Sequence, residues 1–168
     1  MNPTNKTPIS EVYNMDCLEY MQSIPDKFFD LCIADPPYGI NASNMTMGSG
    51  KKKYTKKNWD NNTPKKQTFD EILRVSKNAI IWGGNYFDLP KTKSWIVWDK
   101  GTYGQTSFAD GELAWTTFNK VLKICKLRYS GFIGKDKNRI HITQKPIMLY
   151  HWLLDNYGMG GVKFLIHF

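Results

Sequence analysis

The sequence predicts an α/β fold with a largely parallel sheet, and two observations carry this prediction. Segments with strand composition alternate with segments of helical periodicity along most of the chain, which is typical of parallel strands joined by helices. The chain has 168 residues, of which 41% are hydrophobic, enough for one domain with a packed core. Neither an internal repeat nor a linker divides the sequence, so we expect a single domain over residues 1–168.

In the first half of the chain, the sequence predicts two strand–helix units followed by a third strand. A long loop separates the strand of the second unit from its helix. Apolar residues recur about one helical turn apart at Leu18, Met21 and Ile24. A second helix carries Phe69 and Ile72 on one face, with acidic residues near its start. The expected elements are a strand over 11–16, a helix over 17–24, a strand over 31–35, a long polar loop over about 41–64, a helix over 64–76 and a strand over 78–84.

The second half is richer in strands and ends with a helix and a last strand. Aromatic and β-branched residues dominate three of its segments, which is the composition of strands. The expected helix has Pro146 in its first turn, repeats apolar side chains at Ile147, Tyr150 and Leu154, and ends at Gly158. The expected elements are strands over 94–100, 112–118 and 125–130, a helix over 145–158 and a strand over 161–168.

Charge and cysteine content narrow the class of protein. A net charge of +8 suits an anionic partner. Cys17, Cys32 and Cys125 are odd in number and contain no C-x-x-C pair, so neither a disulfide framework nor a zinc site is indicated. The amino terminus has no apolar core of signal-peptide length, and no apolar run approaches the roughly 20 residues of a membrane span. We therefore expect a protein of the cytoplasm, without a membrane segment and without a metal.

The stretch DPPYG that begins at Asp35 marks the candidate site, because ligands bind outside the carboxyl ends of strands in α/β sheets. Pro36 and Pro37 have no backbone N–H. The turn and the Asp35 carboxylate therefore present only acceptors, which suit a donor-rich ligand such as an amino group. The Tyr38 ring offers a face to a planar base, and such stacking contributes about 1–3 kcal/mol. Alternatively, the prolines only end a strand and Tyr38 is a half-buried core aromatic.

Six segments, in one order, resemble a known family. They are NMDCLEYM, DLCIADPPYGI, IIWGGNYF, SWIVWDK, FADGELAW and HITQKPIMLYHWLL, and they span nearly the whole chain. The sequence resembles the adenine-N6 DNA methyltransferases in the permuted arrangement that places the D-P-P-Y motif first and the cofactor motif last. The resemblance implies a Rossmann-like methyltransferase sheet in three layers (α/β/α). It implies methyl transfer from S-adenosylmethionine to N6 of a flipped adenine in double-stranded DNA.

The resemblance assigns the catalytic turn to Asp35, Pro36, Pro37 and Tyr38. It implies that the Asp35 carboxylate and the Pro36 carbonyl accept hydrogen bonds from the N6 amine while Tyr38 stacks on the base. The amine attacks the methyl group directly, so the rate comes from positioning and electrostatics. Extrusion of the base from the duplex has a cost that contacts in the pocket must offset. An aspartate at the first motif position favours adenine over cytosine N4.

Two further segments are implied to hold the cofactor. Asp16, with the backbone of Cys17, matches the family position near the cofactor's adenine, and a helix N-cap is a second, compatible interpretation of Asp16. The segment HITQKP matches H-P-T-Q-K-P, the wall around the methionine end, where a lysine and neutral polar groups at a helix start suit a carboxylate. Ile142 stands where the family has proline. The implied cofactor residues are Asp16, Cys17, Asp35, His141, Thr143, Gln144, Lys145 and Pro146.

A lysine-rich stretch follows the D-P-P-Y turn. Between Lys51 and Lys66 there are seven lysines and one acid, Asp60, so this stretch has a net charge of +6. Aromatic residues are interleaved with the lysines, and this mixture suits phosphates and unstacked bases. The alternative is a solvated loop without a partner. The predicted DNA-binding residues are Lys51, Lys52, Lys53, Tyr54, Lys56, Lys57 and Trp59.

The glycine-rich cofactor turn that follows the last strand in permuted relatives is not found in this sequence. We therefore expect a sheet that is incomplete at the C-terminus and an incomplete cofactor site, and we hypothesise a truncated product that keeps the base pocket and half of the cofactor pocket. An inactive truncated chain is one alternative. An unpaired edge at the predicted strand over 11–16 would favour self-association as a homodimer. The alternatives are a catalytically dead module that holds DNA through the basic loop, a cytosine-N4 methyltransferase, and a methyltransferase that acts on RNA or protein.

Overall fold

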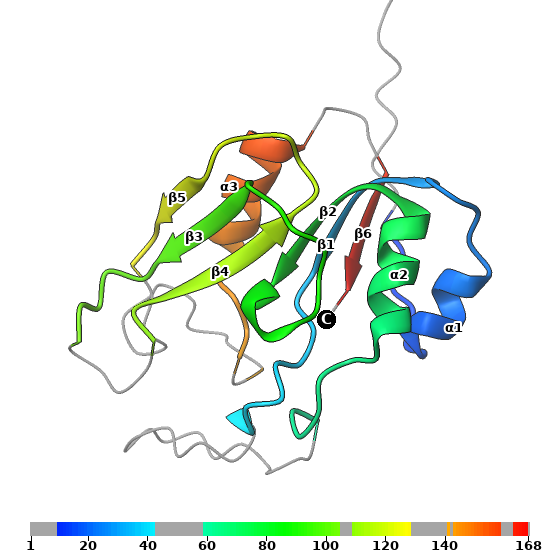
Figure 1. The fold of residues 1–168 in the computed structure, drawn as a ribbon, viewed down its shortest axis with the longest axis horizontal. Coiled ribbons are helices and arrows are strands. Elements are labelled where there is room, and N and C mark those ends of the chain that lie inside the picture. The colour runs from blue at the N-terminus through cyan, green and yellow to red at the C-terminus, as the bar shows by residue number, and fades with distance from the viewer. Residues whose placement is uncertain are drawn as a thin grey trace, which may run out of the picture.

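The computed structural model describes residues 10–42, 59–104, 109–128, 141, 143–158 and 163–167. Within these ranges the fold is mixed α/β, with one six-stranded sheet and helices on both of its faces (Figure 1). The elements are α1 (Cys17–Gln22), β1 (Phe29–Ala34), α2 (Lys66–Val75), β2 (Ser76–Trp82), the 3-10 helix η2 (Gly84–Tyr86), β3 (Trp95–Asp99), β4 (Gly111–Thr116), β5 (Lys123–Lys126), α3 (Ile147–Tyr157) and β6 (Phe164–His167).

The sheet has the strand order β5-β3-β4-β2-β1-β6, in which β4 is antiparallel to both of its neighbours. The other three pairs, β1 with β2, β1 with β6 and β3 with β5, are parallel. The sheet is therefore mixed, but only β4 runs against the other strands, so the prediction of a largely parallel sheet holds apart from β4. An antiparallel neighbour can follow β3 without a crossover helix. As a result, the carboxyl ends of β1, β2 and β3 lie along the same sheet edge as the amino end of β4.

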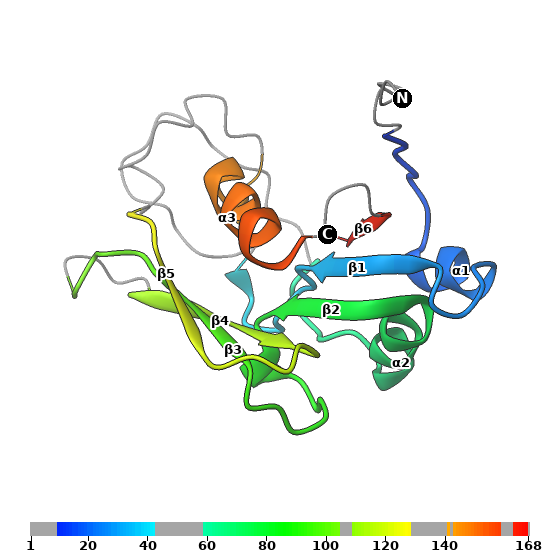
Figure 2. The ribbon, with the colours of Figure 1, turned by 90° about the horizontal axis from the view of Figure 1, so that it is seen from above.

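Successive residues of β1 face two separate layers of the core, because side chains alternate along a strand. Leu31 belongs to a cluster that includes Leu149 of α3, whereas Cys32 belongs to a second cluster that includes Phe69 of α2. Figure 2 shows α3 on one side of the sheet and α2 on the other. Burial on both faces explains why residues 31–34 of β1 are a continuous apolar run and not an alternating one.

Residues 11–16 do not form a strand in the described part of the chain, so that prediction is wrong. Val12 is 94% exposed and Tyr13 is 54% exposed. A strand gains its stability from pairing and from packing against neighbours, and strand composition alone supplies neither. Asp16 is instead the N-cap of α1, and its Oδ1 accepts hydrogen bonds from the backbone N–H of Leu18 (2.8 Å) and Glu19 (3.1 Å).

The other predicted helices and strands are confirmed, with boundaries that differ by a few residues. The strand expected over 125–130 begins earlier, as β5, and residues 129–130 lie outside the described ranges. α3 ends where it was expected, since the N–H of Gly158 donates to the carbonyl of Leu154 at 2.8 Å. None of the helices that the structure describes is long and apolar enough to cross a membrane.

The packing of α3 on the sheet can be tested by truncating one buried side chain. Leu153 is fully buried under the sheet, whereas Met148 on the same helix is 63% exposed. We expect Leu153→Ala to lower the free energy of unfolding by about 2–5 kcal/mol, because it removes apolar contacts and leaves a cavity. Met148→Ala should change it by less than about 0.5 kcal/mol. Urea denaturation followed by tryptophan fluorescence measures both, and equal effects would contradict the described packing.

Candidate active site

Asp35 directly follows the last residue of β1, at the sheet edge where β2 and β3 also end. Glu112 lies at the same edge because β4 begins there, and Lys100 follows the last residue of β3. Three charged side chains from three strands are therefore brought to one edge by the strand directions alone. The sequence predicted this edge for Asp35, as the end of a buried strand, but gave no sign that Glu112 would join it.

Lys145 connects these side chains from the segment just before α3. Its ammonium donates to Oδ1 of Asp35 at 2.5 Å, to Oε2 of Glu112 at 3.1 Å and to the hydroxyl of Tyr38 at 3.1 Å. A lysine ammonium has three hydrogens, so all of its donors are used. The single hydrogen of the Tyr38 hydroxyl has two carboxylate acceptors within reach, Asp35 (3.0 Å) and Glu112 (3.2 Å), and Lys100 pairs with the other oxygen of Glu112 at 2.7 Å.

The charges of this network balance, with two carboxylates against two ammonium groups. Burial opposes ionisation of Glu112, but Lys145 and Lys100 outweigh it and lower the pKa of that carboxyl to about 2. Burial also raises the pKa of Tyr38, and the nearby Asp35 and Glu112 carboxylates raise it further. Tyr38 is therefore a neutral hydrogen-bond donor at physiological pH.

The Tyr38 ring is enclosed by aromatic and backbone groups. Tyr86 stacks on it with 5.1 Å between ring centroids and 15° between planes, and Phe87 meets it edge-on at 6.1 Å. Gly83 has φ +68°, and a Cβ built there would lie 2.3 Å from Cε1 of Tyr38. Only glycine therefore suits this position, because the backbone has a positive φ and because a Cβ would overlap the Tyr38 ring. The core-aromatic interpretation of Tyr38 and its role beside Asp35 are thus compatible.

Asp60 fixes the chain on the other side of the turn. Its buried carboxylate accepts hydrogen bonds from the backbone N–H of Gly39 (2.9 Å) and Ala42 (2.8 Å), and its carbonyl accepts one from Asn41 (3.1 Å). From the sequence, we predicted no role for Asp60 and noted it only as the single acidic residue of the lysine-rich stretch. Its isolation among lysines was the available signal, because a lone buried carboxylate commonly binds backbone N–H groups.

The residues predicted to hold the cofactor are only partly brought together. Lys145 joins Asp35 as described, and Pro146 is the N-cap residue of α3. Nδ1 of His141 lies 3.1 Å from Oγ1 of Thr143, on an exposed part of the chain. The remaining predicted cofactor residues are Asp16, the N-cap of α1, Cys17, a partly exposed free thiol at the start of that helix, and Gln144, whose N–H donates to the carbonyl of His141 at 3.2 Å.

Most of the predicted DNA-binding residues lie outside the described ranges, which resume at Trp59. The Trp59 ring contacts His141, with 5.1 Å between ring centroids. Within the lysine-rich stretch, Trp59 therefore lies against the segment that leads to Lys145, and neighbouring Asp60 ties the stretch to the D-P-P-Y turn. The residues outside the described ranges are Lys51, Lys52, Lys53, Tyr54, Lys56 and Lys57.

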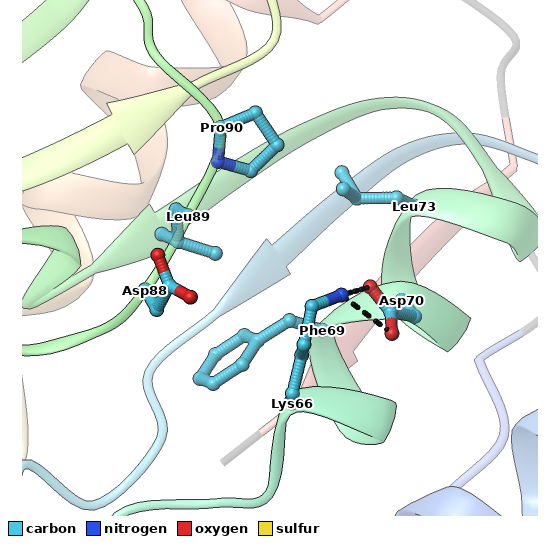
Figure 3. Close-up of a pocket in the computed structure, with 7 residues that line it drawn as sticks. All are labelled: Lys66, Phe69, Asp70, Leu73, Asp88, Leu89 and Pro90. Carbon is cyan, nitrogen blue, oxygen red and sulfur yellow. Dashed lines mark hydrogen bonds and ion pairs between the residues drawn. The ribbon is translucent and has the colours of Figure 1, made fainter.

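A separate groove of about 160 Å³ lies between α2 and the segment that follows η2 (Figure 3). Its most polar feature is an ion pair within α2, in which Lys66 contacts Asp70 at 2.7 Å. The groove is smaller than the roughly 300–1,000 Å³ of most ligand sites, so it is a weaker candidate than the Asp35 network. Its lining residues are Lys66, Phe69, Asp70, Leu73, Asp88, Leu89 and Pro90.

A scan against models of protein families gives no match for the chain, and a search of curated proteins gives none either. Within the described ranges, no three His, Cys, Asp or Glu side chains are grouped to hold a metal ion.

The low pKa of Glu112 predicts a pH dependence of stability. The pKa falls from an ordinary 4.5 to about 2 on folding, so this carboxylate stabilises the fold fully above pH 4.5 and ceases to do so as the pH falls toward 2. Between about pH 5 and about pH 2, wild type should lose on the order of 2 to 3 kcal/mol more unfolding free energy than Glu112→Gln. Urea denaturation at a series of pH values measures this difference.

The matched control is Glu19→Gln, on the exposed face of α1. This variant should lose stability in parallel with wild type over the same pH range. The ion-paired arrangement of Glu112 is contradicted if Glu112→Gln and wild type also run in parallel.

Proposed function

We propose that this chain belongs to the adenine-N6 DNA methyltransferases and that the edge around Asp35 receives the amino group of a flipped adenine. The observation that carries the proposal is the Asp35 carboxylate itself. It stands at the end of a buried parallel strand, on a turn whose prolines offer no N–H, and it is held by Tyr38 and Lys145. A mixed α/β sheet with helices on both faces is compatible with a Rossmann-like methyltransferase domain.

The proposed role of Asp35 is to accept a hydrogen bond from the N6 amine. Both recorded bonds from Tyr38 and Lys145 go to Oδ1. The second oxygen, Oδ2, is the acceptor that we assign to the ligand amine. An acceptor fixed before the substrate arrives keeps electron density on the amine nitrogen without reorganisation during the reaction. The carboxylate side chain is 14% exposed, so the oxygen is only slightly screened by water.

Lys145 acts in this proposal as a positioning residue. Its three donors hold Asp35, Glu112 and Tyr38 in one arrangement, and its side chain is only 5% exposed. Because the ammonium is saturated by these partners, it has no donor left for the carboxylate of a cofactor. We therefore place Lys145 with the base-binding turn, in a role different from the one that the resemblance implied.

The remaining residues fit S-adenosylmethionine in part. When bound, this cofactor supplies an electrophilic methyl group. The exposed Asp16 carboxylate at the start of α1 can accept hydrogen bonds from a ligand hydroxyl, and His141 and Thr143 offer exposed polar groups for the methionine end. The lysine-rich stretch supplies charge for the DNA backbone, since phosphate contacts dominate the affinity of such complexes.

The experiment measures transfer of a labelled methyl group from S-adenosylmethionine to unmethylated DNA, with the product nucleoside identified after digestion. We expect N6-methyldeoxyadenosine from wild type and a loss of about 10²- to 10³-fold in Asp35→Ala, because a preorganised acceptor is removed. N4-methyldeoxycytidine in the digest would move the proposal to the cytosine class. No methylated nucleoside at all, with cofactor binding present in a calorimetric titration, would reject methyl transfer to DNA.

The control for this experiment is Asp30→Asn. Asp30 lies near the opposite end of β1 and pairs with Lys77 at 2.7 Å, so it is a carboxylate of the same strand that is remote from the turn. This variant should transfer methyl groups at the wild-type rate. Circular dichroism of all variants separates loss of activity from loss of fold.

A second candidate is a module that binds DNA without transferring a methyl group. One observation favours this candidate. Oδ1 of Asp35 is already paired with Lys145, as it would be if the ion pair only stabilised the fold. This candidate predicts DNA binding that weakens steeply with salt and is unaffected by Asp35→Ala. A fluorescence-anisotropy titration of both proteins at several salt concentrations distinguishes it from the first.

A further inference from the structure

Two tyrosine rings lie stacked at the candidate site, and they differ in exposure. Tyr38 is half-buried and its hydroxyl is engaged by Asp35, Glu112 and Lys145, whereas Tyr86 is 47% exposed. Their planes are within 15° of parallel. The pair therefore consists of one fixed ring and one ring that faces solvent.

The backbone that carries Tyr86 is held close to Tyr38. The N–H of Tyr86 donates to the carbonyl of Gly83 at 2.8 Å, which closes the 3-10 turn η2. Gly83 approaches the Tyr38 ring so closely that a Cβ would overlap it, and the next residue after Tyr86, Phe87, packs on Phe69 with 4.8 Å between centroids. The backbone of Tyr86 is therefore held beside the site, while its side chain lies at the surface.

We propose that Tyr86 is the second stacking wall of the base site, so that a planar base inserts between Tyr38 and Tyr86. This inference rests on the proposed function and adds to it a residue that stacks on the flat face of the base. Insertion replaces one ring stack by two, and it requires only the exposed Tyr86 side chain to move by about the thickness of a ring. Tyr38 stays in place because three polar partners hold its hydroxyl.

The two contacts divide recognition between them. Asp35 reads the amino group, which only some bases carry, whereas stacking is insensitive to the identity of the base because every base has a π face. Tyr86 should therefore affect affinity for all bases alike, and Asp35 should affect the preference for a base with an exocyclic amine. This division allows the two contributions to be measured separately.

The experiment uses three fluorescein-labelled DNA duplexes that differ at one unpaired position, which carries adenine, unsubstituted purine or an abasic site. An unpaired position lowers the cost of extrusion. Fluorescence anisotropy gives the dissociation constants. Affinity for adenine relative to the abasic site measures the whole base pocket, and affinity for adenine relative to purine measures recognition of the amine.

We expect wild type to bind the adenine duplex more tightly than the abasic duplex. In Tyr86→Ala the ratio of these two affinities should fall about tenfold. Tyr86→Phe should keep it, since the ring face is retained, and Tyr86→Leu should lose it although an apolar side chain remains. Phe28→Ala is the matched control, because Phe28 is a 40% exposed aromatic near the opposite end of β1 and should leave the preference unchanged.

The outcomes separate this inference from the proposed function. If Tyr86→Ala keeps the wild-type preference for adenine over the abasic site while Asp35→Ala loses the preference for adenine over purine, the stacking role is rejected and amine recognition stands. If Tyr86→Ala loses the first preference but wild type binds adenine and purine equally, stacking stands and amine recognition is rejected. A wild type that binds all three duplexes equally rejects both.

Discussion

The buried ammonium of Lys145, placed between two carboxylates, is the interaction on which the candidate site depends. A buried charge is tolerated only when its partners and hydrogen bonds are complete, and here all three donors of Lys145 are used. The partners come from the end of β1 and the start of β4, and Lys145 itself precedes α3. One side chain thus fixes a helix and two strands relative to one another at the edge where ligands of α/β proteins bind.

Aromatic packing continues this site into the core of the protein. Tyr38 contacts Phe87, which contacts Phe69 of α2, and Phe69 belongs to the cluster on the face of the sheet that α2 covers. The close approach of Gly83 to the Tyr38 ring leaves no room for a side chain. The turn after β1 is therefore rigid on its inner side, while Tyr86 on its outer side is open to solvent. Rigidity next to one exposed ring is the arrangement that a site for a planar ligand needs.

Charge is distributed unevenly between the site and the rest of the chain. The network around Asp35 is neutral as a whole, since two ammonium groups balance two carboxylates. Most of the net charge of +8 belongs to the lysine-rich stretch that begins after the turn and is tied back to it by Asp60. In the proposed function, attraction to phosphates and recognition of the base are therefore separate tasks. Binding to the DNA backbone need not disturb the ion pairs that orient Asp35.

Local patterns in the sequence determined most helices and strands and the position of Asp35 at a strand end. Periodicity predicted α2 and α3, and a continuous apolar run predicted β1, because these signals arise from neighbours along the chain. Composition failed at residues 11–16, where a strand needs a partner that the described fold does not supply. Only the tertiary structure placed β4 between β2 and β3, joined Lys145 to Asp35 across 110 residues, and buried Asp60 under the turn. These contacts depend on strand order, which local propensity does not specify.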